Sequence, residues 1–528
     1  MHRAGKTNLS PDDSFVEALL RPEAFNHPAV HIELEETHIS WIILTEQYVY
    51  KIKKPLVLDF LDFGDIEKRR FYCHEEIRLN KPWAPSLYLD VVPITLDDGQ
   101  PRFSGSGEVI DYAVRMHRFD EAKRLDKQLE QDLLFVADMR ELATTIAARH
   151  SGAPVVACEQ RDRYIALARE FMLDNLAALE GFVDAAKLAS LKDWTGQELQ
   201  RTEPLLAQRF DDGFVRDCHG DLHLANLVRL PDGIATFDCI EFNTDFRQID
   251  VMCDIAFLIM DLVEKKRHDL AAHFLNRYLE TTGDYDGVTV LSLFFVYRCL
   301  VRAKVAAIRS REREDATERA ADIEEVGSYC DMATRQIADR VPVLVIMHGL
   351  SGSGKTFVSN QLMAALPAIR VRSDVERKRV FGIDELKSSH SPVGQGIYTN
   401  EANDSVYARL FAVAASVLRA GHNVILDAAF LQRDIRSRAF DIARDCNCPS
   451  VIVDINVPER VLKKRIMDRG HARQDVSEAG LDVLLHQMAT MEALTPEERS
   501  LTVDCDNSEV FDVRKIAPLI LARRSYQE

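Results

Sequence analysis

Apolar and polar residues follow first the spacing of strands and then that of helices along residues 1–340. Within 29–117, helical spacing at 66–80 stands among four predicted strands, at 39–44, 48–53, 87–94 and 109–117. Helical spacing extends from 123 to about 210 and from 254 to 340, and two short strands bracket 219–243. The pattern predicts a small β-rich lobe, about 29–120, followed by a helical lobe, about 121–340.

A different pattern begins at Val341-Pro342, directly after a charged helical stretch. Short apolar runs alternate there with helical segments, and the runs are 343–347, 369–372, 424–426 and 451–455. This alternation is typical of a parallel sheet whose strands are joined by helices. The sequence therefore predicts domains at 1–340 and 341–528 and a mixed α/β and α+β fold class.

Composition narrows the class of protein. The 528 residues are 46% apolar and 28% charged, which excludes a largely disordered chain. A net charge of −18 disfavours nucleic acid and anionic membrane surfaces as partners, because both require a basic face. The chain has no amino-terminal apolar signal segment and no apolar run of about 18 residues, and its cysteines are sparse and scattered. We expect a cytoplasmic protein with no membrane partner, and the sequence does not indicate its oligomeric state.

The segment from Gly349 to Thr356 matches the phosphate-loop pattern G-x-x-x-x-G-K-[ST] at every required position. It follows an apolar run and precedes helical spacing, as this motif requires. Backbone N–H groups and the helix N-terminus would hold a polyphosphate, Lys355 would reach its β- and γ-phosphates, and Thr356 would bind Mg²⁺. We predict an ATP site formed by Gly349, Ser351, Gly352, Ser353, Gly354, Lys355 and Thr356.

Acidic residues end two of the apolar runs in this second domain. Asp427 closes the run 424–426, where a carboxylate can hold Mg²⁺ or its water. Asp374 follows the run 369–372 and would face the same crevice, where it could accept the proton of an attacking hydroxyl. The alternative for either residue is an ordinary cap or turn residue after a strand.

Three arginines spaced by four, Arg465, Arg469 and Arg473, would lie along one face of a helix. They could close over the phosphates and offset transition-state charge, or form a solvated basic face. With the phosphate loop, Arg372-Ser373-Asp374 and Asp427, residues 341–528 resemble the P-loop small-molecule kinases of the zeta-toxin, chloramphenicol phosphotransferase and polynucleotide kinase group. The resemblance implies a parallel-sheet kinase domain with Asp374 as the general base and the three arginines as a lid.

A second set of polar residues lies upstream, where His219, Asp221 and Asn226 form the pattern H-x-D-x-x-x-x-N and Asp238 follows. In phosphoryl transfer an aspartate takes or orients the acceptor hydroxyl, while an asparagine and a second aspartate hold metal ions. One alternative is a metal site through His219 and His223 on a helix, which the intervening glycine disfavours. The other is a polar turn without chemistry.

With this motif, residues 29–335 resemble the aminoglycoside phosphotransferase branch of the protein-kinase-like fold. The resemblance implies a two-lobed domain with Asp221 as the catalytic base and Asn226 and Asp238 as metal ligands. It further implies Lys51 as the phosphate-binding lysine, Glu76 as its helix partner and Met116 at the hinge beside the adenine.

Two departures from that family pattern bear on activity. Residues 35–38, ahead of the first hairpin, contain no glycine-rich phosphate clamp. The second metal motif is Asp238-Cys239-Ile240-Glu241 instead of Asp-Phe-Gly, so Glu241 could share the metal. This domain is therefore either an active kinase or a nucleotide or ligand sensor.

These patterns predict a two-domain kinase that uses Mg²⁺-ATP and transfers the γ-phosphate to a hydroxyl of a small molecule. One alternative is a P-loop kinase joined to a non-catalytic sensor domain. Another is a polynucleotide 5′-kinase, which the acidic net charge disfavours. No spacing in the chain identifies the substrate, and resemblance to a family does not identify it either.

Overall fold

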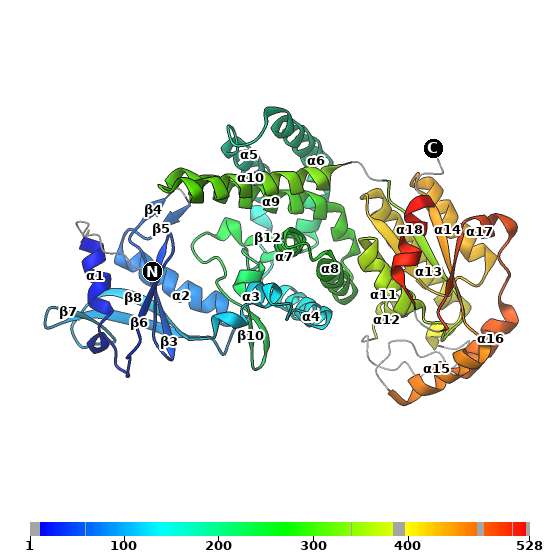
Figure 1. Cartoon of the computed structure of the whole chain (residues 1–528), viewed down its shortest axis with the longest axis horizontal. Helices are drawn as coiled ribbons and strands as arrows, with labels where there is room; N and C mark the ends of the chain where they lie inside the picture. The colour runs from blue at the N-terminus through cyan, green and yellow to red at the C-terminus, as the bar shows by residue number, and fades with distance from the viewer. Residues whose placement is uncertain are drawn as a thin grey trace. The chain divides into compact units, whose positions relative to one another are not determined.

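The computed structural model describes residues 11–58, 60–338, 341–383, 396–472, 480–508 and 511–523 (Figure 1). These residues fall into two units. The first contains Met1–Phe135, Arg149–Leu167 and Arg209–Leu258, and the second contains Val136–Ala148, Ala168–Gln208 and Ile259–Glu528. The domain boundary near residue 340 stays a prediction.

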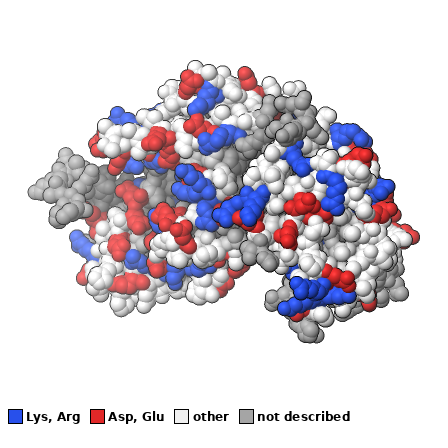
Figure 2. All heavy atoms as spheres, turned by 45° about the vertical axis from the view of Figure 1, so that its right-hand side comes forward, with Lys and Arg blue, Asp and Glu red and all other residues white. Residues whose placement is uncertain are grey.

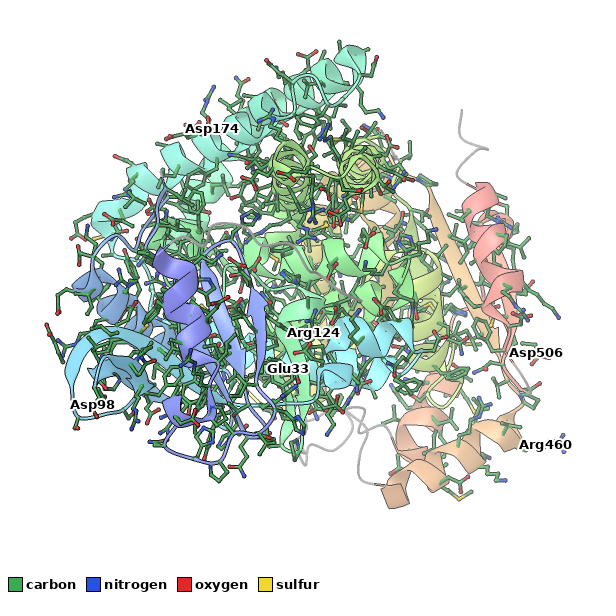
Figure 3. The ribbon with its side chains drawn as sticks, turned by 60° about the vertical axis from the view of Figure 1, so that its left-hand side comes forward. Glu33, Asp98, Arg124, Asp174, Arg460 and Asp506 are labelled. Carbon is green, nitrogen blue, oxygen red and sulfur yellow. The ribbon has the colours of Figure 1, made fainter. Side chains whose placement is uncertain are left out.

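A six-stranded antiparallel sheet with the order β1-β2-β3-β8-β6-β7 forms the centre of the first unit. Its strands are β1 (Glu33–Glu36), β2 (Ser40–Leu44), β3 (Tyr48–Lys53), β6 (Tyr88–Asp97), β7 (Gln100–Phe103) and β8 (Glu108–His117). Apolar alternation predicted four of them; it missed β1, which is exposed at every position, and β7, which is only four residues long. Asp98 and Gly99, with φ of 51° and 77°, turn the chain between β6 and β7, and Figure 3 shows Asp98 at the outer end of this hairpin.

Each face of this sheet packs against a helix, because successive side chains of a strand point to opposite faces. Ile43 and Ile52 lie in the apolar cluster that includes residues of α1 (Pro11–Leu19). Leu44 lies in the other cluster, which includes Cys73 of α2 (Ile66–Asn80). Helix α2 has the bounds predicted from the sequence, and it carries Glu76 beneath the sheet.

Helices, short strand pairs and single 3₁₀ turns make up much of the rest of the chain to residue 337. The helices are α3 (Leu125–Glu130), α4 (Val136–Gly152), α5 (Arg161–Ala178), α6 (Ala185–Asp211), α7 (Val251–Glu264), α8 (His268–Thr282), α9 (Val288–Glu312) and α10 (Ala316–Ile337). The short strands pair as β4 (Val57–Leu58) with β5 (Leu61–Asp62), β9 (Val215–Asp217) with β12 (Gln248–Asp250), and β10 (Leu227–Leu230) with β11 (Gly233–Thr236). Single 3₁₀ turns lie at η1 (Pro22–Ala24), η2 (Glu121–Lys123), η3 (Cys158–Gln160), η4 (Leu224–Asn226), η5 (Thr244–Phe246) and η6 (Tyr285–Gly287).

A five-stranded parallel sheet with the order β14-β15-β13-β16-β17 lies in the second unit. Its strands are β13 (Leu344–His348), β14 (Ala368–Arg372), β15 (Asn423–Asp427), β16 (Ser450–Asn456) and β17 (Thr502–Asp506). The helices that accompany it are α11 (Lys355–Ala365), α12 (Ser373–Val380), α13 (Asn400–Arg419), α14 (Arg433–Asp445), α15 (Glu459–Ala472), α16 (Leu481–Thr490), α17 (Pro496–Ser500) and α18 (Val513–Ala522), with one 3₁₀ turn, η7 (Gly396–Tyr398). The predicted fold class is therefore confirmed.

Both faces of this parallel sheet are covered, because every residue of β13 and β14 is buried. Val345 of β13 and Val358 of α11 share one apolar cluster with Ala272 of α8. Helix α8, which precedes the sheet in sequence, is thus part of the same unit.

No helix in the described ranges is long and apolar enough to cross a membrane. Acidic and basic side chains are interspersed over the face of the molecule that Figure 2 shows. The exclusion of nucleic acid as a partner stays a prediction.

Candidate active sites

The phosphate loop lies between the end of β13 and the start of α11. Gly349, Gly352 and Gly354 have φ of 147°, 83° and 90°, a region that favours glycine. A β-carbon on Gly352 would also lie 3.0 Å from the carbonyl oxygen of Leu462. The glycines let the backbone turn into the N-terminus of α11, which is the arrangement that binds phosphate in P-loop proteins.

Lys355 is the first residue of α11, and its ammonium group lies over the loop. Its Nζ donates to the carbonyl oxygens of Gly349 and Leu350, both at 3.0 Å. Thr356 follows and is exposed. The Ser351 N–H donates to Gln487 Oε1 at 2.8 Å, whereas the buried Ser353 hydroxyl has no hydrogen-bond partner within the described ranges.

One of the three predicted arginines contacts this loop. Arg465 donates to the carbonyl oxygen of Ser353 at 3.3 Å and to that of Asn507 at 2.7 Å. Asn507 also donates to the Ser353 carbonyl oxygen, at 2.8 Å; no motif in the sequence marks this residue. Arg473 and the side chain of Arg469 lie outside the described residues.

The two predicted carboxylates lie at the carboxyl end of neighbouring strands. Asp427 is the last residue of β15 and is buried, and Ser359 of α11 donates to its Oδ2 at 2.9 Å. Asp374 is half-buried in the first turn of α12, directly after β14. Because Arg372 of β14 pairs with Asp427 in the sheet register, both carboxylates lie at the sheet edge that carries the phosphate loop.

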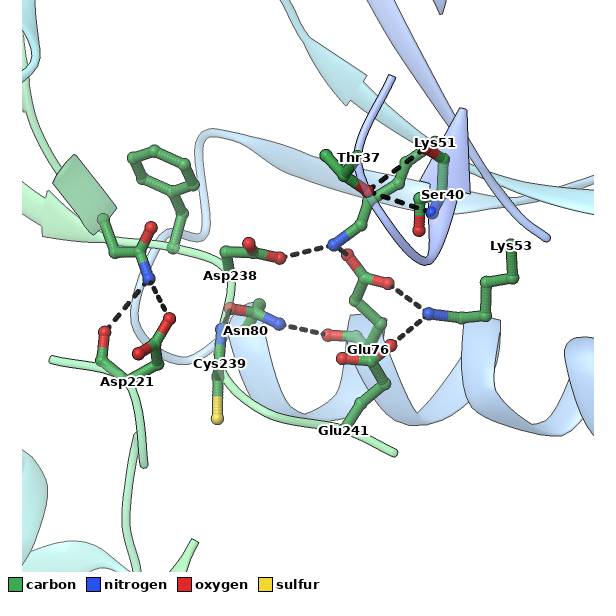
Figure 4. A network of polar contacts seen from close by, with 12 residues as sticks. Thr37, Ser40, Lys51, Lys53, Glu76, Asn80, Asp221, Asp238, Cys239 and Glu241 are labelled. Atoms are coloured by element: carbon green, nitrogen blue, oxygen red, sulfur yellow. Dashed lines mark hydrogen bonds and ion pairs between the residues drawn. The ribbon is translucent and has the colours of Figure 1, made fainter. Parts of the chain in front are cut away.

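In the first unit, Lys51, Glu76 and Asp238 form one ionic array (Figure 4). Lys51 Nζ of β3 lies 2.9 Å from Glu76 Oε1 of α2, and it also donates to Asp238, which follows β11. Lys53 Nζ donates to Glu76 Oε2 at 2.7 Å and to Glu241. Glu76 is therefore shared by two lysines that point to the same face of β3.

Burial and charge together set the protonation of this array. Burial alone would lower the pKa of Lys51 and of Lys53, but the surrounding carboxylates raise both above the ordinary value. Burial opposes ionisation of Glu76 as well, yet the two ammonium groups lower its pKa to about 2. Burial raises the pKa of Glu241. At neutral pH Glu76 is ionised between two charged lysines.

In the loop that carries Asp221 and Asn226, hydrogen bonds hold the carboxylate of Asp221 in place. Asn226 Nδ2 donates to the backbone oxygen of Asp221 at 3.0 Å and to its Oδ2 at 2.9 Å (Figure 4). His223 Nε2 lies 3.3 Å from the same carboxylate oxygen. The side chain of Asp221 is 35% exposed and that of Asp238 is 45% exposed, so a ligand in solution can reach both carboxylates.

A buried aspartate of α7 supports this loop from below. Asp254 accepts hydrogen bonds from the backbone N–H groups of His219 and Gly220 at 3.1 and 2.8 Å, and from His150 Nε2 at 3.0 Å. The sequence motif does not include Asp254, although an aspartate near the start of the largely apolar helix α7 is a visible signal.

The alternative metal sites in this region are not favoured. Residues 219–223 form a loop instead of a helix, and His219 Nε2 is bonded to the Phe237 carbonyl oxygen at 2.9 Å. His150, Cys218 and Asp254 have potential ligand atoms within 4.8 Å of one another. Because two backbone N–H groups and a histidine already occupy the Asp254 carboxylate, we assign this group to the support of the loop.

The structure describes Met116, Glu241 and the connection without a glycine-rich clamp. Met116 is buried on β8, opposite Val49 of β3. Glu241 is buried and bonded to Lys53, an arrangement that makes it a partner of lysine rather than of a metal ion. The connection from β1 to β2 is 37–39 and contains no glycine, and Thr37 closes it by donating to Ser40 O at 3.1 Å.

Parts of both sites lie within matches to known families: the Asp221 loop and Asp238 in the first, and the phosphate loop in the second. Residues 95–291 match the family model described as "Phosphotransferase enzyme family". Residues 344–494 match the model described as "AAA domain". The chain is a kinase, with one segment that matches a phosphotransferase family and a second that matches an AAA-type P-loop domain. The joining of these two domains, predicted from the two motifs, is confirmed.

Relatives and solved structures similar to the kinase are known. Uncharacterized proteins of Mycobacterium tuberculosis and Mycobacterium bovis are 27% identical over 451 residues, which cover 84% of this chain and 88% of each relative. The structure of a choline kinase from Cryptosporidium parvum is 12% identical in sequence, and the match covers 58% of this chain and 90% of that one, with a TM-score of 0.34. The structure of a gluconokinase from Sinorhizobium meliloti is 21% identical in sequence, and the match covers 35% of this chain and 94% of that one, with a TM-score of 0.24.

Replacing Glu76 with glutamine is expected to destabilise the kinase by about 3 kcal/mol at neutral pH, because it removes a shared partner from two buried lysines. The pKa of Glu76 is lowered from 4.5 to about 2, so its stabilisation is complete above pH 4.5 and is lost as the pH falls toward 2. Urea unfolding between these pH values should therefore show the difference between wild type and Glu76→Gln shrinking with acidification.

The matched control is Glu67→Gln, on the same helix, where the side chain is 73% exposed. It should unfold like wild type across this pH range. A wild-type-minus-Glu76→Gln difference that is constant with pH would contradict an ionised Glu76 between the lysines.

Proposed function

We propose that this kinase has two phosphoryl-transfer sites, each moving the γ-phosphate of Mg²⁺-ATP to a hydroxyl of a small molecule. The single observation that supports this most is that the chain contains two separate sets of residues suited to holding phosphate. One is the loop from Gly349 to Thr356 with Lys355 over it, and the other is the Lys51–Glu76–Asp238 array that accompanies the Asp221 loop.

In the first unit, Lys51 would contact the phosphates, with Glu76 holding its ammonium group in place. Asp221, oriented by Asn226, would accept the proton of the acceptor hydroxyl as the phosphoryl group is transferred. Met116 would line the adenine side.

In the second unit, the loop backbone and Lys355 would hold the β- and γ-phosphates, and Asp374 would serve as the base for the acceptor hydroxyl. Arg465 is already hydrogen-bonded to the loop at Ser353, a position from which it can offset charge that develops on the phosphates. Arg469 and Arg473 would extend the lid.

The residues at both sites suit Mg²⁺, because carboxylate and neutral oxygen atoms are its usual protein ligands. Asn226 uses its amide N–H group on Asp221, which directs its amide oxygen away from that carboxylate and, we propose, toward an ion shared with Asp238. In the second unit Thr356 and Asp427 would hold the ion. When bound, Mg²⁺ would neutralise phosphate charge.

The test is transfer from γ-labelled ATP, with Mg²⁺, to the components of a small-metabolite extract. Wild type should produce new labelled species, and Lys355→Ala and Asp221→Ala should each remove some of them. Release of labelled phosphate alone, with no labelled metabolite, would contradict a hydroxyl acceptor.

A second candidate function concerns the first unit alone, which could sense a ligand without catalysis. The observation that favours it is the short connection 37–39, which offers no glycine-rich clamp for the phosphates. The variants at Asp221 and Asp238 described in the Discussion distinguish the two functions.

Asp374→Asn is expected to keep the affinity for Mg²⁺-ATP while transfer at the P-loop site falls by about 10²–10⁴-fold, because a base acts on the acceptor and not on the nucleotide. Single-turnover transfer and nucleotide binding measured on the same protein check this. Asp441→Asn, an exposed carboxylate on α14, is the matched control and should behave like wild type. A loss of nucleotide affinity without a change in transfer per bound ATP would make Asp374 a binding or folding residue.

A further inference from the structure

Helix α8 is hydrogen-bonded to β14, which is one of the two edge strands of the P-loop sheet. The Asn276 side chain pairs with the backbone of β14 as a neighbouring strand would. Asn276 Nδ2 donates to the backbone oxygen of Ala368 at 3.0 Å, and its Oδ1 accepts from the Arg370 N–H at 2.7 Å. Both backbone groups belong to this edge strand of the sheet. Because Asn276 is buried, α8 is fixed in register along β14.

One turn further along α8, Glu280 continues this contact with an ion pair. Its Oε1 accepts from Arg370 at 2.7 Å, and its Oε2 lies 3.8 Å from Arg372. Glu280 and Arg370 are each 2% exposed. Burial opposes ionisation of Glu280, yet the two arginines lower its pKa, so the pair is charged at neutral pH.

Arg370 has a second arm, which points to the first turns of the P-loop helix. Its other terminal nitrogen contacts the Thr356 carbonyl oxygen at 3.4 Å, Ser359 Oγ at 3.5 Å and Asn360 Oδ1 at 3.4 Å. Ser359 in turn donates to Asp427 at 2.9 Å. A continuous set of contacts therefore runs from Glu280 to both residues that would hold Mg²⁺, Thr356 and Asp427.

The end of α8 also contacts the helix that carries Asp374. Arg379 of α12 donates to the backbone oxygen of Glu280 and to the side chain of Glu376. Gly283, with φ of 76°, ends α8 there, and a β-carbon at this position would lie 2.7 Å from Arg379 Nε. Helix α8 thus supports the two sides of the P-loop site, α11 and α12.

We propose that Glu280, acting through Arg370, is a positioning element of the P-loop reaction, so that a helix from the phosphotransferase-family segment sets the geometry of the second site. The inference rests on the proposed kinase function of that site. Helix α8 lies within the family match 95–291, although it packs with the sheet that begins after residue 343. Glu280 touches no reacting atom; it holds the arginine that sets the position of Thr356 and Asp427.

The physical reason is the shape of the guanidinium group. Arg370 reaches Glu280 with one terminal nitrogen and the carbonyl oxygen of Thr356 with the other, whereas lysine has a single nitrogen that cannot occupy both positions. Arg370→Lys therefore keeps a positive charge beside Glu280 but removes the link to α11. This variant separates support of the fold from positioning of the site.

The experiment uses the full chain and measures the Lys355-dependent transfer of label from γ-labelled ATP with Mg²⁺ to the same small-metabolite extract, after subtraction of the Lys355→Ala rate. Arg370→Lys is expected to lower kcat by about 10- to 100-fold, because small displacements of catalytic groups have effects of this size. Its melting temperature and its affinity for Mg²⁺ with a non-hydrolysable ATP analogue should match those of the control. The control is Asp269→Asn, which removes a half-buried pair with Arg267 at the start of the same helix without touching β14.

A second variant, Glu280→Gln, and the double variant complete a cycle. If the two residues act through one another, the double variant should have the kcat of the slower single variant instead of the product of the two losses. Arg370→Lys with the kcat of the control would overturn the proposal, as would additive losses accompanied by equal falls in melting temperature and nucleotide affinity. Absence of any Lys355-dependent turnover in wild type is a separate result, which overturns the proposed function and this inference with it.

Discussion

Replacing Lys355 with alanine in the full chain is expected to lower ATP turnover at the P-loop site by about 10²–10³-fold. The ammonium group of Lys355 lies over the turn of the loop, where it donates hydrogen bonds to the carbonyl oxygens of Gly349 and Leu350. When phosphates occupy the loop, this ammonium group would bind them in place of the carbonyl oxygens and offset the charge of the transition state. The measurement is steady-state turnover of γ-labelled ATP in protein that already carries Asp221→Ala.

Lys515→Ala is the matched control, since Lys515 is an exposed lysine on α18 in the same unit. It should leave turnover at the wild-type rate. Equal rates for Lys355→Ala and Lys515→Ala would show that the loop does not hold reacting phosphates.

Asp221→Asn, introduced into protein that carries Lys355→Ala, is expected to lower the remaining transfer by about 10²–10⁴-fold while Mg²⁺-ATP affinity is kept. The substitution preserves the shape of the side chain next to Asn226 and removes only the proton acceptor. Asp238→Asn should instead weaken Mg²⁺-dependent ATP binding, because a metal ligand acts in the ground state as well as in the transition state. Binding titrations with and without Mg²⁺, and transfer rates on the same preparations, separate the two effects.

Asp232→Asn, in the exposed turn between β10 and β11, is the control for these two variants. It should change neither quantity. If Asp221→Asn and Asp238→Asn also change neither the transfer rate nor the Mg²⁺-ATP affinity, the first unit is a binding or sensing module, and the prediction that it is catalytic is wrong.

The sequence by itself was sufficient for those features that are encoded locally. The phosphate loop needs a strand, a glycine-rich turn and a helix in direct succession, so eight adjacent residues identify it. Helix α2 was predicted with its observed bounds from helical spacing, and the structure shows its start capped by Asp65, whose side chain accepts from the Lys68 N–H. Strands β1, β4, β5 and β7 were missed, since strands of two to four residues carry too few positions for alternation to be recognised. Strand β17 was also missed, although it is as long as β13.

Only the tertiary structure determined which charged groups share a site. The resemblance implied Glu76 as the partner of Lys51 alone, but Glu76 also binds Lys53, and Asp238 joins Lys51 from 187 residues away. Glu241, which the motif placed with the metal ligands, is buried against Lys53. Pairings of this kind depend on how a sheet, a helix and a distant loop pack together, and no periodicity in the chain records that packing.

The contact of α8 with the P-loop sheet illustrates the same limit. The sequence predicted only that residues 254–340 are helical and belong to the upstream lobe, and apolar spacing there did not specify which surface a helix would cover. Asn276 and Glu280 have no signature as partners of Ala368 and Arg370, because a hydrogen bond to a backbone edge or a buried ion pair depends on distance in space alone. Local spacing thus determined the elements and the two motifs of this kinase, whereas long-range packing decided which residues surround each motif and hold it in place.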